Sequence, residues 1–175
     1  MSLVYFPPFG GLDFLKVIVL GLVLVAVQGA AVPWTGAAGP EAALILVIYV
    51  AWRAEQWVAV LAAFMLGLFR DAAGSGLLGI YQAALILMAW VFNAWRRRIH
   101  LETPLVLVLC TFGLSLGVDL LILSPITAVM GWPGPGFNPV PAFLASSLTT
   151  ALAAPPLFWF LGLLTGARVR GRRNG

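Results

Sequence analysis

The sequence predicts an all-α integral membrane protein that forms a single bundle of six transmembrane helices. Of its 175 residues, 62% are hydrophobic and only 9% are charged, whereas about a quarter of the residues in a soluble domain are charged. So few charged side chains cannot cover a water-facing surface, and lipid must therefore face much of the protein. The length suits one transmembrane domain over residues 1–175, with a basic cytoplasmic tail at 165–175.

Six apolar segments follow one another along the chain, at about 14–32, 40–52, 57–69, 77–95, 105–123 and 143–164. The first, fourth, fifth and sixth reach the roughly 20 apolar residues that a helix needs to cross a bilayer, whereas the second and third do not. The short pair forms either a re-entrant hairpin or two full crossings. The turn between them carries Arg53, Glu55 and Gln56, and an arginine left at the bilayer centre costs about 2.5–3.5 kcal/mol. Two full crossings, which bring this turn to water, are favoured.

The basic residues determine the expected orientation. If both termini are cytoplasmic, nine of the ten Lys and Arg residues lie inside and only Arg70 lies outside, as the positive-inside rule requires. The inner residues are Lys16, Arg53, Arg96, Arg97, Arg98, Arg168, Arg170, Arg172 and Arg173. Basic residues at segment ends indicate membrane topology rather than nucleic-acid binding. The run Arg96, Arg97 and Arg98 is expected to anchor the fourth segment among cytoplasmic lipid headgroups.

Prolines mark the later part of the chain. Residues 124–141 contain five prolines and no charge, so this stretch is expected to be an outer loop without regular helix. Because the loop is apolar, we expect it to lie on the membrane surface or beneath a partner. The sixth segment is expected to break at Pro155 and Pro156, with nearby Ser and Thr hydroxyls bonding the carbonyls that the prolines leave free.

One pattern resembles the nucleophile motif of serine hydrolases. Gly113, Ser115 and Gly117 fit G-x-S-x-G, but that motif needs a strand–turn–helix elbow and a histidine within hydrogen-bond reach. The only histidine, His100, is about 22 Å away along a helix. Gly113 and Gly117 are therefore expected to form a small-residue face for helix packing, and an intramembrane hydrolase acting through Ser115 is a remote alternative. We expect no enzyme activity, metal or cofactor.

Two acidic positions each allow two interpretations. Asp119 lies inside the fifth segment, where a carboxylate either has a function or hydrogen-bonds to a hydroxyl or backbone group. Its position one turn after Ser115 favours a buried polar contact, and no second acid is expected inside the membrane. Asp71 follows Arg70 directly, where the pair forms either a local ion pair before a glycine-rich turn or an outward contact to another chain.

Several fragments together resemble the family of the rod shape-determining protein MreD. They are Gln28, Pro40-Glu41, Tyr49 to Arg53, Gly67-Leu68-Phe69-Arg70-Asp71, Gly74-Ser75-Gly76, Leu78-Gly79 and the run from Arg96 to Arg98. The resemblance covers roughly residues 20–98, and the C-terminal half agrees in hydropathy alone.

The resemblance implies a bacterial inner-membrane protein of the cell-elongation machinery that supports peptidoglycan synthesis and rod shape. Its partner would be MreC, in a complex with RodA, a class B penicillin-binding transpeptidase and MreB. It also implies a fold similar to the substrate-capture subunits (S-components) of energy-coupling factor transporters. The expected partner-binding residues are Gly67, Arg70, Asp71, Gly76 and Gly79.

The main alternative is a vitamin-capture subunit of such a transporter. Ala26 and Ala30 on the first segment resemble the small-residue motif with which these subunits dock on their coupling protein, and they are expected to pack against another helix. A capture subunit should also present several polar groups that converge on an outward pocket, and the sequence places few such groups there: Glu41, Arg70, Asp71 and Asn138.

Overall fold

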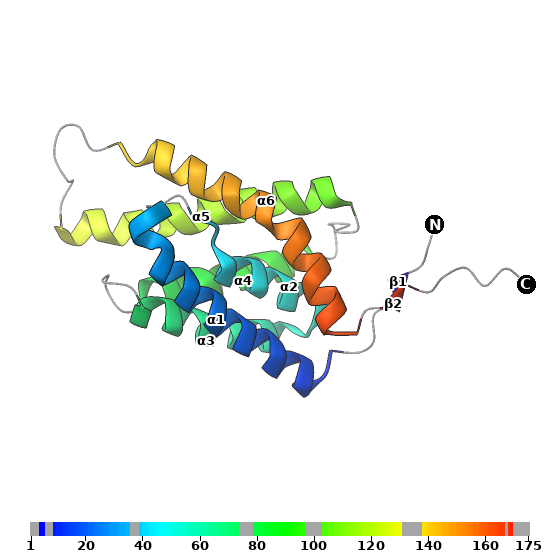
Figure 1. The fold of residues 1–175 in the computed structure, drawn as a ribbon. Coiled ribbons are helices and arrows are strands. Elements are labelled where there is room, and N and C mark those ends of the chain that lie inside the picture. The colour runs from blue at the N-terminus through cyan, green and yellow to red at the C-terminus, as the bar shows by residue number, and fades with distance from the viewer. Residues whose placement is uncertain are drawn as a thin grey trace, which may run out of the picture.

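The structure is a computed structural model, and it describes the backbone of residues 4–5, 9–35, 39–73, 79–96, 103–130, 138–166 and 168–169. Side chains are described for residues 9–30, 39–73, 79–96, 103–124, 127 and 138–166. This part of the chain forms six helices: α1 (Gly11–Thr35), α2 (Ala42–Arg53), α3 (Gln56–Ala73), α4 (Ile80–Trp95), α5 (Pro104–Met130) and α6 (Val140–Leu164). Two short strands, β1 (Val4–Tyr5) and β2 (Arg168–Val169), pair antiparallel (Figure 1).

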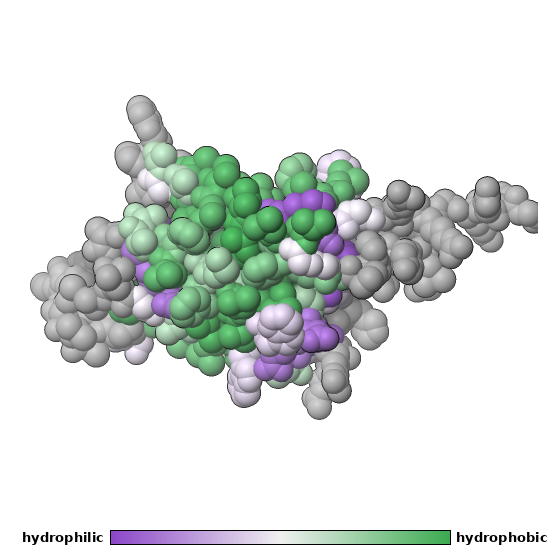
Figure 2. All heavy atoms as spheres, turned by 90° about the horizontal axis from the view of Figure 1, so that it is seen from below, coloured by the Kyte–Doolittle hydropathy of each residue, from purple (hydrophilic) through white to green (hydrophobic). Residues whose placement is uncertain are grey.

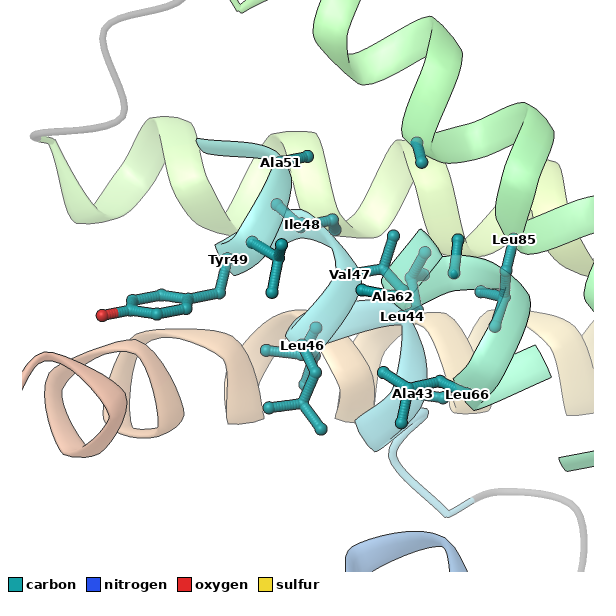
Figure 3. Packing of buried hydrophobic residues seen from close by; sticks show 14 of the residues in the cluster. Ala43, Leu44, Leu46, Val47, Ile48, Tyr49, Ala51, Ala62, Leu66 and Leu85 are labelled. Atoms are coloured by element: carbon teal, nitrogen blue, oxygen red, sulfur yellow. The ribbon is translucent and has the colours of Figure 1, made fainter. Parts of the chain in front are cut away.

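Helix α2 lies at the centre of the bundle. All nine residues from 43 to 51 are at most 2% exposed, and α2 contacts each of the other five helices. Figure 3 shows its side chains pointing to several sides, with Ala62 and Leu66 of α3 and Leu85 of α4 packed nearby. A helix that is apolar all round is stable only when it is enclosed. The all-apolar sequence of α2 therefore explains its central place.

The other helices surround α2 in a ring. Around this ring, α1 packs on α3, α3 on α4, α4 on α5, and α5 on α6, whereas α1 and α6 touch only slightly. The ring therefore has one weak seam, between α1 and α6. The face seen in Figure 2 is hydrophobic across its middle and carries hydrophilic residues towards its ends.

The helix lengths correct part of the segment prediction. Helices α1, α3, α5 and α6 are long and apolar enough to cross a membrane, whereas α2 and α4 have only 12 and 16 residues. The sequence placed the third segment among the short ones and the fourth among the long ones. Helix α3 extends through Arg70 and Asp71 because the Asp71 side chain is buried and hydrogen-bonded. Helix α4 begins late because Gly79 has a φ of 94°, which no regular helix contains.

Both proline predictions are also partly wrong. Helix α5 continues to Met130 and α6 begins at Val140, so both ends of the expected loop are helical. Within α5, the Thr127 hydroxyl donates to the carbonyls of Leu123 and Ser124. Helix α6 also runs unbroken through Pro155 and Pro156. The Thr149 and Thr150 hydroxyls bond the carbonyls of residues 145 and 146. These lie six residues before the carbonyls of residues 151 and 152, which the prolines leave free.

The two chain ends lie at the same end of the bundle. The strand pair joins them, Lys16 Nζ donates to the carbonyl of Leu164 at 3.3 Å, and the Tyr49 hydroxyl lies 2.6 Å from Thr165 Oγ1. We call this the terminal end, and we call the opposite end, which carries Glu41, Asp71 and Gly79, the distal end. Common placement of the termini is what the expected topology requires, while the side of the membrane stays a prediction.

Gly67 gives a test of the α3–α4 packing. A Cβ atom on Gly67 would lie 2.5 Å from the backbone Cα of Gln82, so Gly67→Ala should push the two helices apart and destabilise the protein by about 1–3 kcal/mol. The measurement is the thermal unfolding midpoint in detergent. Gly113→Ala is the matched control, because Gly113 is exposed in a helix with nothing within 4 Å of the added atom. Equal midpoints for the two variants would contradict this packing.

Candidate functional site

The weak seam of the ring contains an apolar groove. The groove has a volume of about 360 Å³ and lies between α1 and α6, with the start of α2 as its floor. Its lining residues are Leu24, Pro40, Ala42, Ile45, Ala153, Pro156, Leu157 and Phe160. The alanines permit close approach of another helix. A groove with this lining offers no group for catalysis or metal binding, but it can hold an apolar helix or an acyl chain.

A second feature is the connection between α3 and α4 at the distal end. Asp71 is only 8% exposed. Its Oδ2 accepts hydrogen bonds from the backbone N–H groups of Gly79 and Gln82 at 2.9 and 3.1 Å, and its Oδ1 accepts from that of Tyr81 at 3.2 Å. These donors are the free N–H groups at the start of α4. A carboxylate in that position also interacts favourably with the helix dipole, so Asp71 caps α4 from α3.

The neighbouring Arg70 does not pair with Asp71. Both residues belong to the described part of the chain, and no ion pair joins them. The Arg70 guanidinium lies over the ring of Tyr81, 5.1 Å from its centroid, which is the geometry of a cation–π contact. Arg70 thereby fastens the end of α3 to the first turn of α4.

Most residues of the predicted partner-binding set therefore make contacts within this protein. Gly67 faces Gln82, and Asp71 and Gly79 bond to each other; Arg70 is partly exposed, and Gly76 is outside the described residues. The helix-packing set is also divided. Gly117 would place a Cβ 3.3 Å from Met88 Cε, whereas Gly113, Ala26 and Ala30 are exposed.

A group of buried polar side chains lies between α2, α5 and α6. Ser147 Oγ donates to Asp119 Oδ2 at 3.2 Å, and the backbone N–H of Glu41 donates to Thr150 Oγ1 at 2.8 Å. Ser147 and Thr150 are one turn apart on α6, so Glu41 and Asp119 approach the same face of that helix. Glu41 is 5% exposed and its Oε2 has no hydrogen-bond partner.

This group settles the contact of Asp119 and corrects the position of Glu41. The partner of Asp119 is the hydroxyl of Ser147 on α6, not that of Ser115 one turn away, whose Oγ has no partner. The sequence placed Glu41 in an outer loop, whereas the structure buries its side chain against α6. The burial of Glu41 follows only from the packing of α2 against α6. In the sequence, an acid beside Pro40 predicts a solvent-exposed helix end. Within the described residues, no group of three or more His, Cys, Asp or Glu could hold a metal ion.

The serine-hydrolase geometry is not formed. The stretch from Gly113 to Gly117 lies within the continuous helix α5, whereas a nucleophile elbow needs a sharp turn between a strand and a helix. Ser115 is fully buried. His100 lies outside the described residues.

Basic side chains cap helices at the terminal end. Arg96 Nη1 donates to the carbonyls of Ala51 and Ala54 at 2.9 and 2.6 Å, where α2 ends. Arg96 thus has an internal contact that the predicted lipid anchor did not include, and Arg97 and Arg98 are outside the described residues. Cations at helix C-termini bond the free carbonyls and complement the dipole.

Comparison with known proteins identifies a family. The family model for the rod shape-determining protein MreD matches residues 12–164, which includes all six helices almost completely. No curated protein and no solved structure matches the chain.

The cap on α4 can be tested by removing the Asp71 carboxylate. Asp71→Ala leaves three backbone N–H groups at the start of α4 without their acceptor, and we expect a loss of about 1–2 kcal/mol. Hydrogen exchange should accelerate at the amides of Gly79, Tyr81 and Gln82. Asp71→Asn keeps one carbonyl acceptor, so its stability and its amide exchange rates should lie between those of the wild-type protein and Asp71→Ala. Unchanged exchange at these amides in Asp71→Ala would show that the carboxylate does not cap the helix.

Proposed function

Because the chain belongs to the family of the rod shape-determining protein MreD, we propose that it is a non-enzymatic scaffold subunit of the bacterial cell-elongation complex. The observation that carries this proposal is the family match over residues 12–164. The architecture is consistent with it, because the described residues lie almost entirely in apolar helices. Such a chain acts on other proteins mainly through surfaces within the membrane. Its role would be to support peptidoglycan synthesis and rod shape.

We place the protein in the bacterial inner membrane, as a multi-pass chain with both termini in the cytoplasm. Two features support this orientation. Both chain ends lie at the terminal end of the bundle, and Lys16 and Arg96 lie there too. Basic residues concentrate on the cytoplasmic side of membrane proteins.

The proposed direct partner is MreC, whose single span would occupy the groove between α1 and α6. This seam is where the ring around α2 is weakest. The groove is apolar and has small residues at Ala42 and Ala153, so an apolar helix could approach the backbone closely. RodA, the class B transpeptidase and MreB would join through the same complex.

The distal connection between α3 and α4 is a proposed second contact. Arg70 is partly exposed there and would meet the partner, while Gly67, Asp71 and Gly79 would act by holding the end of α3 against the start of α4. The substitution Arg70→Glu would test this contact independently of the groove, because Arg70 does not line the groove.

The groove proposal predicts the effect of filling it. In Ala153→Phe the larger side chain would occupy the space for the MreC span, and recovery of MreC with the purified protein should fall about tenfold, equivalent to about 1.4 kcal/mol. Leu152→Phe is the matched control, since Leu152 neighbours Ala153 on α6 but is exposed and outside the groove. Thermal unfolding in detergent checks that both variants fold. Full recovery of MreC with Ala153→Phe would exclude the groove as its binding site.

A second candidate is the vitamin-capture subunit of an energy-coupling factor transporter. The observation that favours it is the buried polar group of Glu41, Asp119, Ser147 and Thr150, since a capture subunit needs convergent polar groups. Ala26 and Ala30 are exposed on α1, as docking to a coupling protein would need.

Mass spectrometry of the protein purified from native membranes separates the two candidates. The scaffold proposal predicts that MreC copurifies and that no vitamin is bound. A stoichiometric vitamin, lost in Asp119→Ala, would establish the capture function instead.

A further inference from the structure

The outer surface of α3 and α4 is apolar over only a short distance along the helix axes. Its large exposed hydrophobic residues are Leu61, Phe64, Leu68 and Phe69 on α3, and Leu87 and Trp90 on α4. An arginine stands at each end of this surface, Arg70 at the distal end and Arg96 at the terminal end. The distance between these two charges limits the thickness of hydrocarbon that the surface can face.

Both guanidinium groups are held in place. That of Arg70 lies over the Tyr81 ring, and that of Arg96 bonds the carbonyls of Ala51 and Ala54. An arginine near a helix end normally extends its charge towards the headgroups. The Arg70 and Arg96 side chains cannot extend towards the headgroups without losing these contacts. The depth of each charge in the membrane is therefore fixed by the groups that it contacts.

The separation follows from the length of α4. Between the backbone of Tyr81, whose ring holds Arg70, and the backbone of Arg96, the helix rises about 22 Å at 1.5 Å per residue. The hydrocarbon core of a typical bilayer is about 30 Å thick. A tilt of α4 would shorten the span further. A bilayer of ordinary thickness would therefore draw at least one arginine into hydrocarbon.

The opposite side of the bundle has a much longer apolar surface. Helix α6 contains 25 residues without a charged side chain and is about 37 Å long. Its exposed residues include Leu144, Leu148, Leu152, Trp159 and Leu163. The two sides of the protein thus fit bilayers of different thickness.

We propose that the α3–α4 surface thins the bilayer against it and preferentially binds phospholipids with short acyl chains. Lipid, rather than another helix, is the occupant for two reasons. The exposed Leu, Phe and Trp side chains are too large for the close backbone approach of packed membrane helices. Trp57 and Trp95 are exposed at its terminal end, where aromatic side chains meet lipid headgroups.

Tryptophan quenching on each side of the protein tests this proposal. Trp90 on α4 is 57% exposed and Trp159 on α6 is 70% exposed, so each can report on the lipid beside it. Two single-tryptophan chains, with the other tryptophans replaced by phenylalanine, are reconstituted in dioleoylphosphatidylcholine. Brominated phosphatidylcholines with myristoleoyl, oleoyl or erucoyl chains then compete for the surface, and quenching gives their relative affinity.

Trp90 should favour the myristoleoyl lipid over the oleoyl lipid by a factor of about three, and Trp159 should favour oleoyl or erucoyl chains. The same preferred chain length at both reporters would overturn the proposal. If a single-tryptophan chain does not fold, the full chain is compared with Trp90→Phe and with Trp159→Phe, each a conservative change at an exposed position. The quenching lost in each variant then reports the same two surfaces, and equal chain-length profiles would again overturn the proposal.

Discussion

The bundle is organised around α2, whose residues 43–51 are buried on every side. A helix of this composition must be covered by others, and the five remaining helices provide that cover. The ring that they form is closed least well between α1 and α6, where the start of α2 becomes the floor of the apolar groove. The proposed docking site is thus a consequence of enclosing a short helix with five longer neighbours.

Charged side chains complete the ends of the helices. At the distal end, Asp71 bonds the first N–H groups of α4; at the terminal end, Arg96 and Lys16 bond the last carbonyls of α2 and α6. Acids at helix N-termini and bases at C-termini are favoured by the helix dipole. Because α2, α4 and α6 all point the same way, this arrangement also concentrates basic residues at one end. The concentration of basic residues at the terminal end and the capping of these helices therefore have a common structural basis.

Sequence reasoning located the six apolar segments but not all of their lengths. The apolar run that precedes Arg70 predicted a helix end there, yet α3 continues to Ala73. A charged residue can remain in a helix when the next helix provides hydrogen bonds to its side chain, as α4 does for Asp71. The same limit applies to Glu41 and Asp119. Hydropathy predicted that Asp119 is buried in a helix, but its bond to Ser147 and the burial of Glu41 depend on how α2, α5 and α6 pack.

By itself the sequence determined the membrane environment, the order of the six apolar segments and the resemblance to the MreD family, and it predicted an orientation. These depend on composition, on the order of apolar runs and on local motifs. The tertiary structure decided which helix is central, where the ring is weakest, and which charged residues serve the chain's own helix ends. These properties arise from contacts between residues far apart in the chain, such as Arg96 with Ala51 and Lys16 with Leu164. No local pattern specifies such contacts, because the apolar faces of these helices are alike and only their mutual packing distinguishes them.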